Sequence, residues 1–223
     1  MIKLAYIKQS PVFFFGFLFI IIIGSILVLV EGNPSSFILL NSYHSFWLDT
    51  FFIKYTYLGH GFFAIFLAVF YFFWLKSKQT GVVLLYAFLL SGLITQTLKH
   101  IIYSPRPKLF FGNSEQSYFI NGIEFAYNNS FPSGHTATAF AVATVLAITD
   151  KNKKFHLLIL LAALFIGFSR IYLGQHFLTD VLAGMLTGIF SGIVCVYIAR
   201  KYDWTESRNK QLVASREQSS LPS

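Results

Sequence analysis

The chain of 223 residues is 55% hydrophobic and only 12% charged, and its formal net charge is +8. An ordinary soluble domain carries about a quarter of its residues as Asp, Glu, Lys or Arg, so this composition excludes that class and predicts one helical domain in a membrane. The single cysteine, Cys195, excludes an intramolecular disulfide.

The chain is expected to begin with a membrane-spanning helix followed by a helix at the membrane surface. Residues 11–30 are almost entirely apolar, and they are long enough to cross about 30 Å of hydrocarbon. Because the turn at residues 31–34 offers no small-residue cleavage site, we expect this helix to be retained rather than removed as a signal peptide. Residues 37–57 mix apolar, aromatic and polar side chains, a pattern typical of an interfacial helix.

Five further apolar runs complete a predicted bundle of six transmembrane helices. They cover residues 58–75, 81–102, 133–148, 155–171 and 177–198. The sequence therefore predicts an all-α, polytopic membrane domain over residues 1–201, with a short interfacial helix after the first span. A polar tail, which we expect to be disordered and cytoplasmic, follows at residues 202–223.

The distribution of Lys and Arg predicts the orientation of this bundle. Six spans place both termini on one side, and twelve basic residues fall there: Lys3, Lys8, Lys76, Lys78, Lys151, Lys153, Lys154, Arg200, Lys201, Arg208, Lys210 and Arg216. The other side holds five, which are Lys54, Lys99, Arg106, Lys108 and Arg170. Because basic residues accumulate on the cytoplasmic side, we expect both termini on the cytoplasmic side of a cell membrane, such as a bacterial inner membrane. The positive charge is thus a topology signal, and no nucleic-acid partner is expected.

The outward-facing ends of the third to sixth spans carry polar side chains that are costly in a membrane. They are Lys99, His100, Arg106, Ser133, Gly134, His135, Ser169, Arg170, His176 and Asp180. Gly134 belongs to the group by its position at a helix start. Ionisable groups at membrane depth mark functional sites by default. We therefore expect one site at the outer mouth of the bundle.

The spacing of these residues predicts phosphate chemistry. His176 and Asp180 lie four apart and share a helix face, so the carboxylate can hold one ring nitrogen protonated and leave the other as a nucleophile or base. A helix start at Ser133 and Gly134 suits an anion, with Ser133 as the cap and Gly134 allowing close approach. A protonated His135 can supply a proton to a departing oxygen.

The cations complete this interpretation, because the lysine and the two arginines of the group donate to phosphate oxygens. We expect His176 to attack phosphorus and water to hydrolyse the resulting phosphohistidine. The sequence has no cluster of carboxylates or cysteines that suggests a metal site, so we expect the reaction to need no metal and no cofactor.

Three motifs give the chain a resemblance to a known family. Residues 99–107 read KHIIYSPRP, residues 132–135 read PSGH and residues 169–180 read SRIYLGQHFLTD. They resemble the three motifs of the type 2 phosphatidic acid phosphatase (PAP2) family, which shares its phosphate site with vanadium haloperoxidases, and the resemblance spans residues 55–198. It implies a six-helix membrane core, catalytic roles for His176, His135 and Asp180, and phosphate binding by Lys99, Arg106, Ser133, Gly134 and Arg170. The haloperoxidase branch is soluble, so the composition favours the lipid phosphatase branch.

Several functions remain open on this basis. Undecaprenyl diphosphate, phosphatidic acid, phosphatidylglycerol phosphate and lipid A phosphate are all candidate substrates in the outer leaflet. An enzyme that moves phosphate to another lipid would use the same residues. A non-catalytic phospholipid-binding or transport protein would need the cations but not the pair His176 and Asp180. The aromatic loop at residues 108–129 either selects the lipid or anchors the loop, and the oligomeric state is open.

Other histidines and glycines are expected to be structural. His60 and His100 match no motif, and His44 and His156 are expected at the surface. Three glycines recur at intervals of four, as in helix contacts made by small residues, either within the chain or between subunits. They are Gly184, Gly188 and Gly192.

Overall fold

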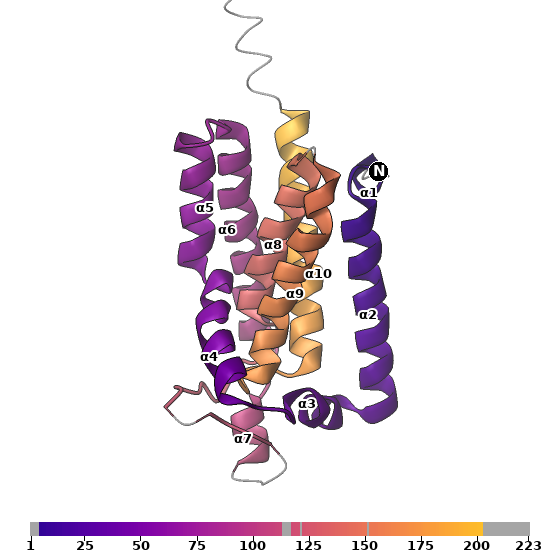
Figure 1. Ribbon diagram of the computed structural model, residues 1–223, viewed down its shortest axis with the longest axis vertical. Helices are drawn as coiled ribbons and strands as arrows, with labels where there is room; N and C mark the ends of the chain where they lie inside the picture. Colours follow the sequence, from indigo (N-terminus) through magenta and orange to yellow (C-terminus); the bar gives the residue numbers. More distant parts are fainter. Residues whose placement is uncertain (1–4, 113–116, 121, 151, 203–223) are drawn as a thin grey trace, which may run out of the picture.

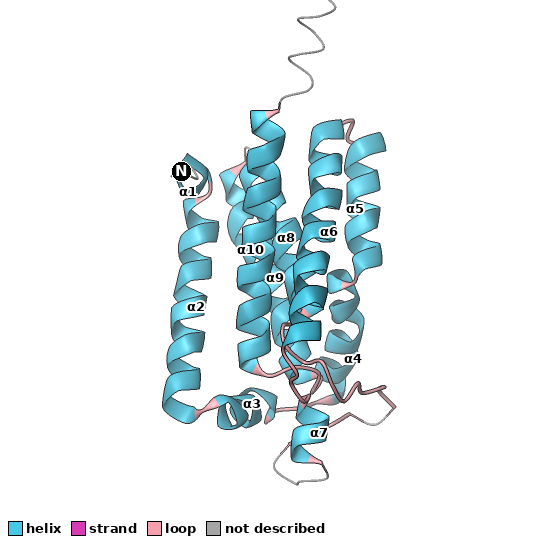
Figure 2. Ribbon diagram, turned by 180° about the vertical axis from the view of Figure 1, so that it is seen from behind, coloured by secondary structure: helices cyan, strands magenta, loops and turns pink. Residues whose placement is uncertain are grey.

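The computed structural model describes residues 5–112, 117–120, 122–150 and 152–202, and all regular secondary structure in these residues is helical (Figure 2). The elements are α1 (Ala5–Gln9), α2 (Pro11–Glu31), α3 (Asn33–Asn41), α4 (Phe46–Tyr55), η1 (Thr56–Gly59), α5 (Gly61–Phe73), α6 (Lys78–Ile101), α7 (Pro107–Phe111), α8 (Gly134–Thr149), η2 (Lys153–Phe155), α9 (His156–Tyr172) and α10 (Leu178–Lys201). Of the expected polar tail, residues 203–223 lie outside the described residues.

The helices are those of an integral membrane protein. Among the described residues, α2, α6, α10 and the unit of η2 with α9 are each long and apolar enough to cross a membrane. A fifth candidate is the pair Phe46–Gly59 and Gly61–Phe73, which is bent by 57°. The apolar α8 has only 16 residues. Four to five candidate spans are therefore present among the described residues, and the expected count of six requires both the bent pair and α8 to cross.

The region after the first helix differs from the sequence expectation. Instead of one interfacial helix over residues 37–57, the chain forms α3, which lies across one end of the bundle, and α4, which leads through η1 into α5 (Figure 1). Ser45 caps α4 by accepting the N–H of Leu48, and His60 caps α5 by accepting the N–H of Phe62. These two caps divide the region because each one starts a new helix.

The core of the bundle is α8, which packs against α6, α9 and α10 (Figure 1). Its contact with α10 depends on the three regularly spaced glycines. A Cβ atom at Gly184 would lie 2.6 Å from Ser133 O, one at Gly188 would lie 2.5 Å from Ala137 O, and one at Gly192 would lie 2.6 Å from Thr144 Cβ. The glycine spacing thus serves packing within the chain.

This packing positions the functional ends of four helices together. The chain termini of the described bundle, α1 and the end of α10, lie at one end, and α3, α4 and α7 lie at the other (Figures 1 and 2). The end of α6, the start of α8, the end of α9 and the start of α10 meet at the end that carries α3 and α7. The polar residues singled out in the sequence lie at these four helix ends, except that Arg106 is the N-cap residue of α7 and His176 lies in the turn before α10.

Two histidines are placed otherwise than expected. His156 is only 1% exposed, so the expectation that it lies at the surface is wrong. The side chain of His44 is 7% exposed, with Nδ1 2.9 Å from Asp49 Oδ1 and the ring between those of Tyr118 and Tyr172. The ring of His44 is enclosed by aromatic rings remote in sequence, which a local pattern does not reveal.

Candidate active site

The start of α8 forms one wall of the site. Ser133 is fully buried and caps the helix, because its Oγ accepts the N–H and the hydroxyl of Thr136. The N–H of Ser133 donates to the backbone oxygen of Asp180 over 2.9 Å, which ties the start of α8 to the start of α10. Among the described residues, a Cβ at Gly134 would meet only Thr95 Cγ2, at 3.7 Å, so the backbone here has room for a ligand. The first N–H groups of a helix lack intrahelical acceptors and favour an anion.

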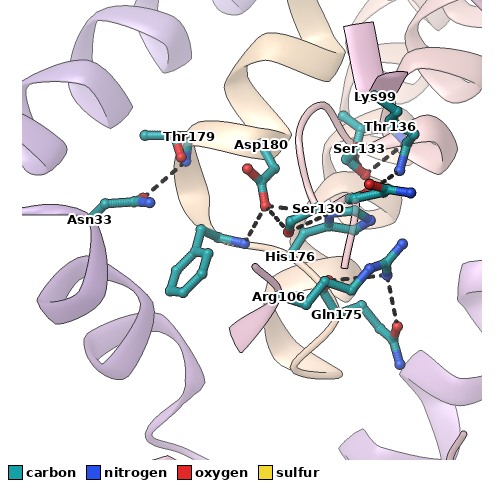
Figure 3. A network of polar contacts seen from close by, with 12 residues as sticks. Asn33, Lys99, Arg106, Ser130, Ser133, Thr136, Gln175, His176, Thr179 and Asp180 are labelled. Atoms are coloured by element: carbon teal, nitrogen blue, oxygen red, sulfur yellow. Dashed lines mark hydrogen bonds and ion pairs between the residues drawn. The ribbon is translucent and has the colours of Figure 1, made fainter. Parts of the chain in front are cut away.

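The turn between α9 and α10 places the imidazole of His176 beside Asp180 (Figure 3). Each residue is 2% exposed. Asp180 Oδ2 accepts the N–H of Phe177 over 2.9 Å and lies 3.4 Å from His176 Nδ1. The backbone N–H of His176 donates to Arg170 O over 3.1 Å. The carboxylate thus faces Nδ1, and Nε2 is the nitrogen left to react.

Burial keeps this imidazole neutral. Burial, together with the charges of Arg106 and Arg170, lowers the pKa of His176 to about 3, although the hydrogen bond to Asp180 acts in the opposite direction. A neutral ring has a free electron pair on Nε2, as a nucleophile requires. Burial also lowers the pKa of Arg106, which Asp180 partly offsets, and a guanidinium still remains protonated at neutral pH.

Lys99 and Arg106 both hold the loop that leads into α8 (Figure 3). Lys99 Nζ donates to Asn129 O over 2.6 Å. Arg106 Nε donates to Asn128 O over 3.1 Å, and its Nη1 donates to Gln175 Oε1 over 3.1 Å. Two consecutive loop carbonyls therefore receive donors from two cations.

Arg170 is the most deeply enclosed cation of the site. It is 8% exposed, and its Nη1 donates to Thr56 Oγ1 over 2.6 Å. Its Nε is buried without a hydrogen-bond partner among the described residues. A buried donor without a partner is costly, and the cost is greater for a charged group. An anion beside Arg170 would satisfy it.

His135 lies against the bend between η1 and α5. A Cβ at Gly59 would lie 3.1 Å from His135 Cβ, and the ring of His60 is 5.7 Å from that of His135, centroid to centroid. No hydrogen bond of the His135 ring is found within the described part of the chain. His100 is exposed at the end of α6 and makes no hydrogen bond to this group among the described residues.

Sequence reasoning missed three side chains that contact the predicted residues. Ser130 is fully buried, and its hydroxyl donates to Asp180 Oδ2 over 2.5 Å. Gln175 and Thr56 accept hydrogen bonds from the arginines described above. Ser130 and Thr56 lie outside the three motifs, and Gln175 is one of the five unspecified residues inside the third. Each contact joins segments far apart in the chain. Only the adjacency of Gln175 to a motif histidine was a signal.

The assembled site suits an anion with tetrahedral oxygens. Three cations and one carboxylate, Asp180, surround a neutral imidazole at the start of a helix. The positive charge exceeds the negative charge, so the site attracts a phosphate and can stabilise charge that develops on it.

Comparisons with known proteins point the same way. The model of the PAP2 superfamily matches residues 80–204, a range that includes all three motifs. The chain is 28% identical to the lipid A 4'-phosphatase of Porphyromonas gingivalis over 61% of its own length and 60% of that protein. It is 32% identical to phosphatidylglycerophosphatase B of Bacillus subtilis over 64% of its own length and 71% of that protein.

Two solved structures share the fold. The crystal structure of Aquifex aeolicus LpxE superposes with a TM-score of 0.64 at 33% identity, covering 75% of this chain and 98% of that one. The structure of a transmembrane PAP2-type phosphatidylglycerolphosphate phosphatase from Bacillus subtilis superposes with a TM-score of 0.61 at 23% identity, covering 89% of this chain and 98% of that one.

Proposed function

The chain belongs to the PAP2 superfamily, and we propose that it is a membrane lipid phosphatase that releases phosphate from a lipid phosphomonoester or diphosphate. The observation that carries this proposal is the meeting of the His176 and Asp180 pair with three cations at the start of α8. A binding protein needs the cations but has no use for a neutral imidazole backed by a carboxylate.

In the proposed reaction, Nε2 of His176 attacks phosphorus in line with the bond to the leaving oxygen. That bond breaks as the bond from nitrogen to phosphorus forms, and His135 gives a proton to the departing oxygen. Water then attacks the phosphohistidine and gives a proton back to His135. The bond from nitrogen to phosphorus breaks, which releases inorganic phosphate and free His176. Asp180 orients the ring and stabilises the positive charge that the imidazole gains.

The remaining predicted residues would hold the phosphate. Lys99, Arg106 and Arg170 donate to its oxygens, and Ser133 and Gly134 offer a hydroxyl and helix-start N–H groups. In this proposal, phosphate oxygens take over donors that now reach Asn128 O and Asn129 O. The unpartnered Nε of Arg170 gains an acceptor in the same step.

The orientation in the membrane is part of the proposal. We propose six spans, with α8 as the short central one, in a domain over residues 1–201 with a cytoplasmic tail after it. Both termini then face the cytoplasm and the site faces the periplasm or the exterior. The excess of Lys and Arg at the terminal end supports this orientation. A reporter fused after Ser223 that proved external would contradict it.

The substrate is proposed from the site and from the relatives. Curated relatives are named as phosphatases of lipid A, phosphatidylglycerophosphate and undecaprenyl diphosphate. These lipids, together with phosphatidic acid, share a phosphate next to a long apolar chain, which fits a cationic site at the end of a membrane bundle. Analysis of the products would separate hydrolysis from transfer of the phosphate to a second lipid.

The test is phosphate release by the detergent-purified protein from a panel of these lipids, with a chelator present and with His176→Ala in parallel. We expect release that resists the chelator and disappears in the variant. Release that persisted in His176→Ala would exclude His176 as the nucleophile. Lipid binding without release from any substrate would favour a binding or transport protein.

A further inference from the structure

The hydroxyl of Ser130 lies between the two residues of the proposed nucleophilic pair. Ser130 Oγ is 2.5 Å from Asp180 Oδ2, to which it donates, and 3.4 Å from His176 Nδ1 (Figure 3). The direct separation of His176 Nδ1 and Asp180 Oδ2 is also 3.4 Å, which is long for a hydrogen bond to a carboxylate. The shortest contact in the group is therefore that of the serine with the carboxylate.

The hydroxyl can join the two side chains because it both donates and accepts. Its one proton is used on Asp180, so its lone pairs are left to accept the Nδ1–H of His176. Asp180 Oδ2 in turn is fixed by the N–H of Phe177. A chain from Nδ1–H through the hydroxyl to the carboxylate keeps the imidazole proton on Nδ1 and the free electron pair on Nε2.

The fold holds Ser130 rigidly in this place. It is fully buried, and its backbone N–H donates to Ser104 O over 3.0 Å. Ser104 lies two residues before Arg106, and Ser130 lies three residues before Ser133. Ser130 thus connects three segments: the loop of the first motif, the residues just before the second motif, and the Asp180 carboxylate of the third.

From this geometry we propose that Ser130 is a positioning residue for the reaction, which sets the ring orientation and tautomer of His176 through Asp180. The inference rests on the proposed function, because positioning matters only if His176 is the nucleophile. Ser130 does not touch the phosphate in this account, so its loss affects the chemical step rather than substrate binding.

The first test is the kinetics of Ser130→Ala. We expect kcat to fall by about 10- to 100-fold, since a hydrogen bond to a charged group is lost, while KM changes by less than about threefold. Inhibition by inorganic phosphate, which reports on the cations, is expected to be unchanged. Ser130→Thr keeps the hydroxyl and is expected to recover most of kcat. A rise in KM with unchanged kcat would overturn the inference.

The second test is a double-mutant cycle with Asp180→Asn. If Ser130 acts through Asp180, adding Ser130→Ala to the Asp180→Asn protein should lower kcat by less than about threefold. The reason is that the effects of residues that act as a unit are not additive. Equal costs in both backgrounds would show that Ser130 acts independently and would overturn the inference. Ser91→Ala is the matched control, because Ser91 is also fully buried but donates within α6 to Phe88 O; it should leave kcat unchanged.

The third test needs no turnover and separates this inference from the proposed function. Nuclear magnetic resonance of histidine-labelled protein in bilayers reports the tautomer of each ring, and the signal of His176 is assigned as the one lost in His176→Ala. We expect the Nδ1–H form in the native protein and a mixture of tautomers in Ser130→Ala. An unchanged His176 signal in Ser130→Ala would overturn the role of Ser130 even in an active phosphatase. Failure of all lipids to release phosphate, with the tautomer change present, would overturn the proposed function alone.

Discussion

Replacing Gly184 by alanine tests whether the contact between α8 and α10 aligns the start of α8 with the pair of His176 and Asp180. The added Cβ would lie 2.6 Å from Ser133 O, 3.0 Å from Thr136 Cβ and 3.3 Å from Ala137 N. Two of these atoms belong to the backbone at the start of α8, so no flexible side chain can move aside. To restore an ordinary contact of 3.4 Å at Ser133 O, the helices must separate there by about 0.8 Å.

The effect on activity should exceed the effect on stability. Overpacking of this kind lowers the free energy of unfolding by about 1–3 kcal/mol. The higher helix propensity of alanine than of glycine offsets up to about 1 kcal/mol of this loss. Ser133 and Asp180 are joined across the same contact, so the start of α8 moves relative to His176. Misplacement by about 1 Å can cost 100-fold, and we therefore expect kcat/KM to fall about 10- to 100-fold.

Gly92→Ala is the matched control, because Gly92 also lies inside a long helix but no described residue comes within 4 Å of the added Cβ. We expect its activity to stay within about twofold of the native protein and its stability to rise by up to about 1 kcal/mol. Phosphate release and thermal unfolding in detergent measure both effects. Equal activity of Gly184→Ala and Gly92→Ala would show that this helix contact does not align the site, as would a loss of activity explained entirely by unfolded protein.

Three further predictions follow from individual contacts. Thr56→Val removes the acceptor of Arg170 Nη1, so it should destabilise the protein by about 1–3 kcal/mol and raise KM; unchanged thermal unfolding and KM would contradict this. Arg106→Lys keeps the charge but loses the fork that reaches the loop and Gln175 together, and KM should rise about tenfold; an unchanged KM would mean that charge alone suffices. The pKa of His176 is lowered from 6.5 to about 3, so the unfolded chain binds more protons between these values and stability should fall as pH decreases through this window. A melting temperature that rose on acidification from pH 6.5 would contradict the burial of a neutral His176.

Hydropathy predicted the long helices closely because a membrane imposes a minimum apolar length. The run at 155–171 is found as α9 at His156–Tyr172, and the run at 177–198 is found within α10. The helices after α2 were harder to predict from hydropathy, because the polar side chains of this region are paired inside the fold. His44 and Asp49 interact with each other and with Tyr172, so α4 joins the bent pair with α5 rather than remaining at the surface alone.

Motif spacing predicted that the residues of the candidate site would meet, and the structure brings them together at one end of the bundle. The spacing indicated which residues share a helix face, as the four-residue interval between His176 and Asp180 does. The spacing did not predict the contact of Thr56 with Arg170, 114 residues away, or that of Ser130 with Asp180, 50 residues away. Such partners arise only when the helices pack, and no local pattern marks them.

The most direct measurement is capture of the phosphorylated protein. Protein mixed with a lipid substrate labelled on its phosphate is quenched in alkali, which preserves phosphohistidine, and the labelled peptide is sequenced. We expect label on His176 in the native protein, and none in His176→Ala. Label on another residue, or rapid phosphate release with no labelled protein at any quench time, would contradict the central claim that His176 is the nucleophile.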